Sequence, residues 1–291
     1  MAASHLNPEI LHRLLPKRAG KDEFPVLEER YDQPQEIRYE KIESFKEVRA
    51  CLRLRYEVYR YVNFIGENKD RLDVDPYDFY STFLGAYNVT RGRKDLIGML
   101  RIISGDKISK TTSFIEKLIR TAADPNIRSI SKRPQFLPIM ESFQLPDSYF
   151  SCFQKSSSLD DSIHPYEVSR LAIRPEYWLH SIDVGLHYLL IMDSWLHKPP
   201  REYFLIAVHP RARKRYEKLG MKIVPGTGQV IYKRFNQLAI AMITDMETLL
   251  NNPRNYGKTC ESIFGSFKKN KSFTLTVDKR FYFNHINNGK D

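Results

Sequence analysis

The segment YEVSRLAIRPEYW, residues 166–178, is the stretch from which the rest of the chain is interpreted. Its apolar residues predict a strand over 166–173 that ends before Pro175. Glu167 and Arg170 interrupt this apolar pattern three positions apart. In a regular strand such residues point to opposite faces, so both serve one site only if a bulge intervenes, and bulges are common beside active sites. Burial of unpaired charge is costly, which favours a site over a structural pairing with Glu167 on a solvated edge.

The elements around this strand alternate between helical and strand patterns. Apolar residues have helical spacing in 40–61, and a hairpin-like pair of strands follows at 81–89 and 95–104. After the strand at 166–173 we predict a helix, a strand, a basic helix, a strand and a last helix, at residues 182–196, 203–210, 211–220, 228–235 and 238–250. This order is typical of an α/β sandwich with a mixed sheet, because strand–helix–strand steps imply parallel neighbours or right-handed crossovers.

The composition bounds the class of protein. The 291 residues carry 46 Lys and Arg against 35 Asp and Glu, a net charge of +11 that favours acidic partners such as nucleic acid, an anionic membrane or an acidic protein. The three cysteines lack the spacing of a metal site, which indicates free thiols in a reducing compartment and no bound metal. We expect a cytoplasmic protein with an N-terminal arm (1–40), one main domain (41–236) and a helical, basic C-terminal extension (237–291).

Four further charged residues are candidates for the same site. Arg101 shares a strand face with apolar residues and needs a carboxylate partner there. Asp75 and Asp78, in the acidic loop before the hairpin, are the candidate partners, and Arg55 on the preceding helix is placed to join them. A buried structural pair explains Arg101 as well as a site does. The D-x-x-D spacing also occurs in turn capping, and an arginine such as Arg55, taken alone, is usually solvated.

A basic cluster lies on the predicted helix at 211–220. Its members are Arg211, Arg213, Lys214 and Arg215. A solvated helix face is the ordinary explanation of such a run, and nucleic acid is the functional alternative. The sequence has no helix-turn-helix, zinc-finger or RNP-type pattern and no Walker A motif. Nucleic-acid binding is therefore supported by net charge alone.

Two segments resemble a known fold. LAIRPEYW with VGLHYLL, followed by AVHPRARKRYEKLGMKI, resembles the central strand–helix unit and the next helix of the Gcn5-related N-acetyltransferases (GNAT). The resemblance implies a three-layer α/β/α sandwich with a mixed, largely antiparallel central sheet. That fold usually holds the coenzyme A pyrophosphate on backbone amides of a glycine-rich turn. Here the turn is LHSIDVG, residues 179–185, in which only Gly185 remains and Asp183 would repel a phosphate.

The order of the charged motifs resembles one branch of that superfamily, the acyl-homoserine-lactone (autoinducer) synthases and the long-chain N-acyl amino acid synthases. The branch has an Arg with an aromatic residue four positions later, then D-x-x-D, an Arg in a strand, and E-x-S-R. The matching residues here are Arg55 with Tyr59, Asp75 with Asp78, Arg101, and Glu167 with Ser169 and Arg170. Phe64 is the candidate for the position where autoinducer synthases usually have Trp, and this chain is longer than a typical autoinducer synthase.

The resemblance implies a role for each matched residue. Glu167 would help to deprotonate the attacking amine, directly or through water, with Arg170 as a second catalytic residue that anchors an ion network. The residues implied in binding or ordering the acceptor are Arg55, Tyr59, Phe64, Asp75, Asp78 and Arg101. Backbone N–H groups at splayed central strands would hold the thioester oxyanion, and an apolar tunnel in the sheet would hold the acyl chain.

The implied donor is acyl carrier protein, whose acidity makes the basic cluster its expected landing site. We expect no bound cofactor, because the phosphopantetheine thioester is a co-substrate, with acyl-CoA as the alternative donor. An N-acyl amino acid and an acyl-homoserine lactone made from S-adenosylmethionine compete as products. An inactive acyltransferase-like module that binds a lipid or a protein is the alternative of another class. The predicted helix at 238–250 is expected to cap the core, mediate a dimer or contact a membrane surface.

Overall fold

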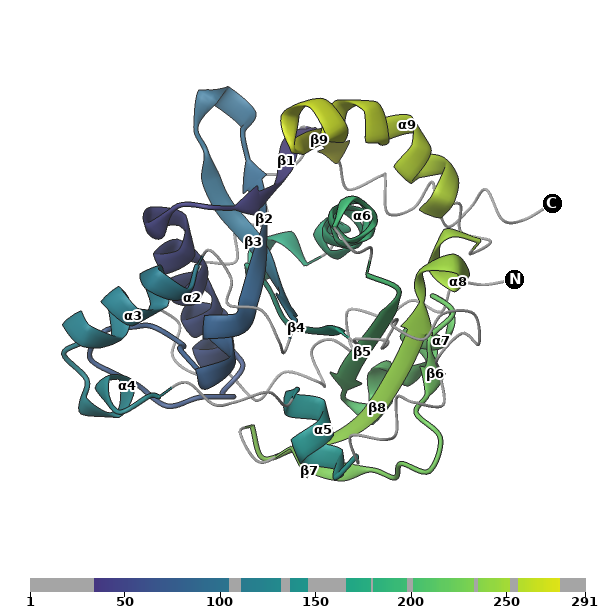
Figure 1. The fold of residues 1–291 in the computed structure, drawn as a ribbon. Helices are drawn as coiled ribbons and strands as arrows, with labels where there is room; N and C mark the ends of the chain where they lie inside the picture. The colour runs from purple at the N-terminus through teal and green to yellow at the C-terminus, as the bar shows by residue number, and fades with distance from the viewer. Residues whose placement is uncertain are drawn as a thin grey trace.

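The computed structural model describes residues 34–104, 111–131, 137–145, 166–178, 180–197, 201–232, 235–251 and 256–277. The strands are β1 (Gln35–Ile42), β2 (Ser81–Asn88), β3 (Asp95–Ile103), β4 (Tyr166–Ile173), β5 (Tyr203–Val208), β6 (Lys222–Ile223), β7 (Val230–Tyr232), β8 (Gln237–Asp245) and β9 (Ser272–Val277). They form one sheet in the order β6-β8-β5-β4-β3-β2-β1-β9, and β7 also pairs with β8 (Figure 1).

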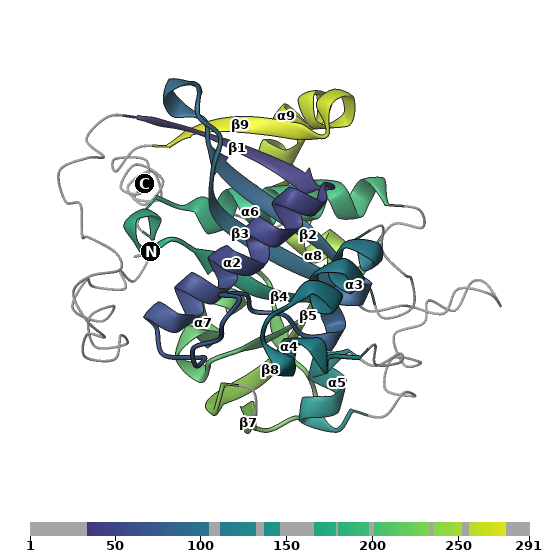
Figure 2. The ribbon, with the colours of Figure 1, turned by 90° about the vertical axis from the view of Figure 1, so that its left-hand side faces the viewer.

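The helices cover both faces of this sheet. They are α2 (Phe45–Tyr61), α3 (Thr112–Thr121), α4 (Pro125–Arg128), α5 (Pro138–Phe143), α6 (Ile182–Leu196), α7 (Arg213–Glu217), α8 (Met246–Leu250) and α9 (Tyr256–Asn270). α2 packs on one face with α3 beside it, and α6 packs on the other face with α9 outside it (Figures 1 and 2). The three-layer α/β/α sandwich is therefore confirmed. Among the described helices, none is both long and apolar enough to cross a bilayer.

The helix α6 is apolar on nearly every side because the sheet and α9 enclose it. Its Leu186, Leu189 and Ile191 are buried in the core. In its first turn Gly185 lies against the ring of Tyr39 from β1, and a Cβ added to Gly185 would come within 2.1 Å of that ring. Gly185, the glycine noted in the segment 179–185, is thus explained by its close packing against Tyr39.

The sheet is mixed and largely antiparallel, as expected. The parallel neighbours are β4 and β5, joined through α6, and they pair at only two positions, Tyr166 with Phe204 and Glu167 with Leu205. Beyond these pairs the two strands separate. The second predicted step, from β5 through α7 to the strand expected at 228–235, does not give adjacent strands. The strand observed there is the short β7, which pairs antiparallel with β8, and β8 in turn pairs antiparallel with β5.

The helix predicted at 238–250 is wrong over most of its length. Residues 237–245 form β8, a central strand, and the helix α8 is confined to Met246–Leu250. A strand buried on both faces is a nearly continuous apolar run, which periodicity alone cannot distinguish from a buried helix. The sheet consequently continues past residue 236, and β9 extends it by pairing with β1. At the other end β1 begins at Gln35, inside the predicted arm, whose residues 1–33 lie outside the described ranges.

Candidate active site

A bulge in β4 gathers the charges of this strand on one face of the sheet. Across the β3–β4 ladder Arg101 pairs with Ser169 and Met99 pairs with Ala172, so β4 holds one more residue than β3 between these pairs. Arg170 lies in the bulge with a left-handed backbone, φ +57°. That conformation favours glycine, so the surrounding structure must hold the arginine in place. The bulge that the sequence argument required is present.

The acidic loop before β2 is held by its own carboxylates. A short 3-10 helix, η1 (Pro76–Tyr80), is capped by Asp75, whose Oδ1 accepts the Tyr77 N–H at 2.9 Å. In return, Asp78 Oδ2 accepts the Asp75 N–H at 2.8 Å. Both carboxylates are almost completely buried. Turn capping is therefore one function of the D-x-x-D spacing, and the same oxygens also accept bonds from arginines.

Arg55 of α2 binds this loop from the helical layer. Its Nη1 and Nη2 donate to the two oxygens of Asp78 at 3.0 and 2.8 Å, a bidentate pair. Its Nε lies 2.7 Å from Asp73 Oδ2, and its Nη2 donates to the Asp73 carbonyl. Burial lowers the pKa of Arg55, but Asp73 and Asp78 more than offset this and raise it well above its usual value. The arginine is completely buried, so it is part of the network and not a solvated side chain.

Asp75 is shared by two arginines from adjacent strands. Arg101 Nη1 lies 2.7 Å from Asp75 Oδ1 and 2.7 Å from Asp78 Oδ1, and Arg101 Nε donates to Ser169 Oγ at 3.1 Å. Arg170 Nη2 donates to Asp75 Oδ2 at 2.9 Å. We call the six charged groups the ion network: Arg55, Arg101, Arg170, Asp73, Asp75 and Asp78. Each is buried, and three charges of each sign compensate one another, which buried charges require.

Glu167 lies beside the ion network with a different environment. It is 1% exposed, and its Oε2 accepts the backbone N–H of Ile139, at the start of α5, at 2.8 Å. Burial raises the pKa of Glu167 to about 7, while the hydrogen bond from Ile139 and the positive charges of Arg101 and Arg170 limit the rise. A carboxylate with this pKa can accept a proton near neutral pH and release it again, as a general base must.

An aromatic cluster covers the open side of Arg170. The ring centroid of Phe235, in the connection from β7 to β8, lies 4.5 Å from the Arg170 guanidinium carbon, and that of Tyr59 lies 5.9 Å from it. Phe235 also contacts Tyr59 and Phe64, each with a centroid distance of 5.3 Å. Tyr232 stacks on Phe235, and burial with the nearby Glu167 raises the pKa of Tyr232 to about 12. Tyr59 and Phe64, both implied by the resemblance to bind the acceptor, belong to this aromatic cluster.

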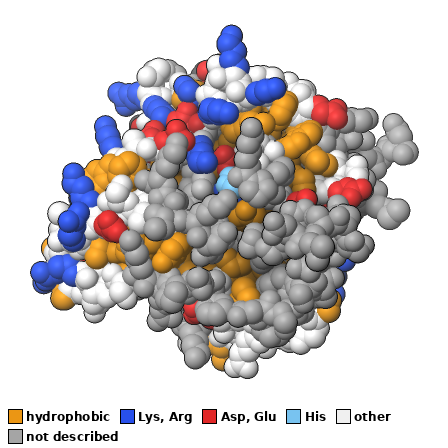
Figure 3. All heavy atoms as spheres, in the orientation of Figure 1, with side chains coloured by type: hydrophobic (Ala, Val, Ile, Leu, Met, Phe, Trp, Pro, Cys, Tyr) orange, Lys and Arg blue, Asp and Glu red, His pale blue; other side chains and the backbone are white. Residues whose placement is uncertain are grey.

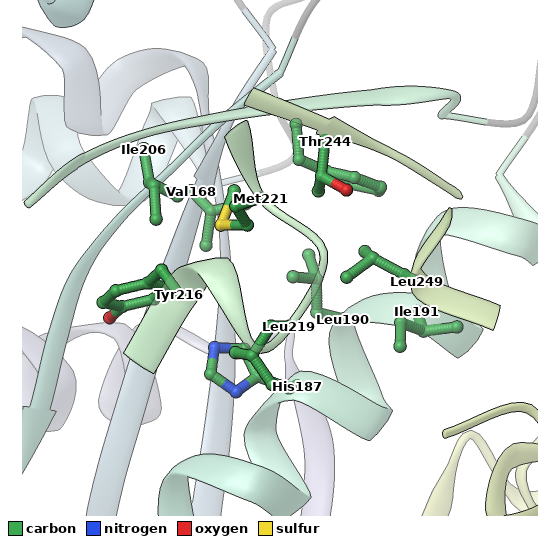
Figure 4. A pocket seen from close by; sticks show the side chains of 11 residues that line it. Val168, His187, Leu190, Ile191, Ile206, Tyr216, Leu219, Met221, Thr244 and Leu249 are labelled. Atoms are coloured by element: carbon green, nitrogen blue, oxygen red, sulfur yellow. The ribbon is translucent and has the colours of Figure 1, made fainter. Parts of the chain in front are cut away.

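A narrow cavity opens on the other side of the sheet, where β4 and β5 separate (Figure 4). Its volume, counted with the open space at its mouth, is about 430 Å³. The lining is mainly apolar and comes from β4, β5, α6, α7, α8 and β8. Val168, next to Glu167 in β4, and Tyr216 of α7 belong to it. Burial raises the pKa of Tyr216, and the positive charge of Arg215 opposes this rise.

The four residues of the basic cluster lie on the surface at α7 and the turn before it. Arg213 pairs with Glu217 at 2.6 Å, and Arg215 pairs with Asp183 in the first turn of α6. Arg211 and Lys214 are exposed. On the face drawn in Figure 3, Lys and Arg side chains lie along the upper and left-hand edges, over the β2–β3 hairpin and α3, and do not form a single central patch among the described residues.

Several site residues were missed from the sequence. Asp73 stands in the same acidic loop as Asp75, and this proximity was an available signal. Ile139 contributes a backbone N–H, for which no side-chain signal exists. Tyr232 and Phe235 come from the far end of the sheet, and nothing local in the sequence connects them with Arg170. Outside the described ranges lie Cys152 and the last basic residues. The described residues contain no group of three or more His, Cys, Asp or Glu placed to bind a metal.

Comparison with known proteins relates one segment of the chain to a family model. Residues 54–132, which include Arg55, the acidic loop and Arg101, match the model of the acetyltransferase (GNAT) domain. The matched segment covers less than half of this chain. The fold class of the chain and its assignment to the acyltransferases, both expected from the sequence, agree with this match. No curated protein matches the chain.

Solved structures similar to this chain include members of the branch named from the sequence motifs. FeeM, an N-acyl amino acid synthase from uncultured soil microbes, is 14% identical with a TM-score of 0.49, over 76% of this chain and 95% of FeeM. The CoA-dependent acyl-homoserine lactone synthase BjaI is 14% identical with a TM-score of 0.45, over 76% and 82%. The acyl-homoserine lactone synthase LasI is 13% identical with a TM-score of 0.42, over 74% and 91%.

Proposed function

We propose that this protein transfers a fatty acyl group from the thioester of acyl carrier protein to the amine of an amino acid or a related small acceptor. The observation that carries the proposal is the buried Glu167, whose pKa of about 7 suits a base at neutral pH. It lies beside an ion network that matches the charged motifs of N-acyl amino acid synthases and autoinducer synthases. The GNAT domain match supports acyl transfer as the reaction class.

The reaction needs one base and no covalent enzyme intermediate. The amine nitrogen attacks the thioester carbonyl carbon, and Glu167 accepts a proton from that nitrogen. The C–N bond forms, the C–S bond breaks, and the thiolate leaves and takes up a proton. The separation of β4 and β5 beyond Glu167 frees backbone N–H groups, which suits them to bind the oxyanion of the tetrahedral intermediate.

The ion network holds the groups of the site in a fixed arrangement. Both oxygens of Asp75 and both oxygens of Asp78 accept hydrogen bonds from arginines and backbone N–H groups. We therefore assign these aspartates to positioning the loop and the arginines, a narrower role than the binding of the acceptor expected from the sequence. A preorganised polar wall of this kind lowers the cost of reorganisation when charge develops in the transition state.

The cavity fits the acyl chain. It begins at Val168, the neighbour of Glu167, and is lined mainly by apolar side chains. We infer that this apolar lining takes the hydrocarbon of the acyl chain. The basic cluster suits an acidic donor protein, since all four of its residues are exposed. Acyl-CoA remains the alternative donor.

The test is mass spectrometry of lipid extracts from cells that express the protein, compared with Glu167→Gln. Glu176→Gln, a partly exposed carboxylate just beyond the same strand, is the matched control. We expect a new N-acyl species with the wild type and the control, and its loss with Glu167→Gln. Its mass identifies the chain and the acceptor, and a lactone is recognised because mild alkali adds water to it. A folded wild-type protein that forms no N-acyl product from any acyl thioester would contradict the proposal.

A further inference from the structure

His187 introduces an imidazole into the apolar cavity between α6 and the sheet. It projects from α6 among Leu190, Tyr216 and Leu219 (Figure 4). Its Nδ1 is inaccessible to solvent and makes no hydrogen bond within the described part of the chain. Burial lowers the pKa of His187 to about 4, so the ring is neutral at physiological pH and has one donor and one acceptor nitrogen. Buried polar atoms normally have a partner, so this nitrogen requires an explanation.

A trapped water is a poor partner for this nitrogen. An ordered buried water usually makes two to four hydrogen bonds, whereas the cavity lining is almost entirely apolar. The hydroxyl of Thr244, which also lines the cavity, is directed to the backbone carbonyls of Gly220 and Asp245, each at 3.4 Å. A ligand that is apolar along most of its length, with one polar group opposite His187, fits this lining better than water.

We propose that His187 selects acyl chains that carry a hydroxyl group part-way along a linear hydrocarbon. This inference rests on the proposed function, because it takes the cavity as the acyl site. A hydroxyl group both donates and accepts, so it pairs with Nδ1 in either neutral tautomer of the imidazole. A saturated chain of the same length leaves that nitrogen without a partner, and a site built in this way discriminates against such a chain.

The test compares acyl thioesters of equal length, one saturated and the others hydroxylated at successive carbons. For the wild type we expect kcat/KM for one hydroxylated chain to exceed that for the saturated chain about tenfold or more. His187→Leu should abolish or reverse this ratio, because the leucine no longer offers a polar partner. His187→Asn, whose amide occupies nearly the position of Nδ1, should keep the preference. Ile191→Leu, a change of similar volume in the same cavity, is the matched control and should leave the ratio unchanged.

Two results would overturn the inference. One is a wild type that uses every chain with the same kcat/KM, and the other is His187→Leu with an unaltered ratio. Calorimetric binding of the matched free fatty acids to the wild type and His187→Leu measures the same preference without catalysis. If binding discriminates as expected while no thioester is turned over, the hydroxyl site stands and the proposed acyl transfer fails. If turnover occurs and neither assay discriminates, acyl transfer stands and the hydroxyl site fails.

Discussion

Arg170 and Asp75, 95 residues apart in the chain, are joined by a buried hydrogen-bonded ion pair of 2.9 Å between Nη2 and Oδ2. This contact joins the bulge of β4 to the capped loop before β2. The loop, Arg55 and Arg101 belong to one continuous segment of the chain, whereas Glu167 and Arg170 arrive later from β4. The pair therefore fixes the proposed base relative to the rest of the ion network.

Activity should depend on the protonation of Glu167. Because a base must be unprotonated, kcat/KM should fall as the pH drops through about 7, the pKa of this group. Glu167→Gln should lower kcat by roughly 100-fold or more and remove this limb of the pH profile. Steady-state rates from pH 5.5 to 8.5, a window of about one and a half units on either side of the pKa, provide the measurement. An unchanged acidic limb in the variant would show that another group titrates.

Asp78 should be essential for stability. Asp78→Asn keeps the shape of the side chain but leaves Arg55 without its bidentate partner, and breaking such a buried pair costs about 3–5 kcal/mol. Glu57, which pairs with Arg53 at 3.0 Å on the exposed side of the same helix, is the control, and Glu57→Gln should cost about 0.5 kcal/mol or less. Urea unfolding measures both, and similar losses for the two variants would argue against a stabilising network.

Phe235 should support Arg170 without being part of the core. Phe235→Ala removes the ring that faces the Arg170 guanidinium and should lower kcat/KM roughly tenfold, with little change in Tm. Phe235→Tyr preserves the ring and should restore activity. Phe45 holds Lys117 at 4.8 Å in a similar contact away from the site, so Phe45→Ala should leave kcat/KM unaltered. Equal activity of Phe235→Ala and wild type would remove Phe235 from the site.

Gly185 should not tolerate a side chain. Gly185→Ala places a methyl group inside the ring of Tyr39 and should destabilise the protein by about 1–3 kcal/mol. Gly265, exposed on α9 with open space around it, is the opposite case. There Gly→Ala should stabilise by about 0.5–1 kcal/mol through helix propensity. Calorimetric melting distinguishes the two, and a stable Gly185→Ala protein would mean that Tyr39 can move.

The donor protein should be attracted by charge. Turnover with acyl carrier protein should fall steeply with added salt, and a double reversal, Arg211→Glu with Lys214→Glu, should raise KM for this donor. Arg128→Glu, on α4 at a distance from α7, is the matched control. Turnover with a short acyl-pantetheine donor should respond to neither change. A KM for acyl carrier protein that is independent of salt would remove the basic cluster from the docking surface.

The central strand and the first members of the site were predictable because their signals are local. Pro175 marks the end of the strand, and the helical spacing of apolar residues before residue 61 predicts the helix that carries Arg55. Glu167 and Arg170 are charged residues in an otherwise apolar strand, and they can serve one site only if the strand has a bulge. The structure places Arg55 and Arg170 in the ion network and Glu167 beside it.

The remainder depended on contacts that no local pattern encodes. β8 resembles a helix in sequence because both of its faces are covered, and only its pairing with β5 reveals the strand. Phe235 contacts Arg170 from the β7–β8 connection, at the far end of the sheet. The surroundings of His187 are recognisable only once α7 and β8 are packed around the cavity. Such features follow from topology, which is fixed by long-range pairing.

The pairing of β1 with β9 makes the described chain nearly circular. Gln35 and Val277 are direct partners across an antiparallel pair, so a hairpin-length linker is enough to join them. A chain joined there and opened at the surface turn around Gly226, where space is free, would keep every ladder of the sheet and every member of the ion network. The order of the strands along the chain can therefore be changed without changing the architecture that the site needs.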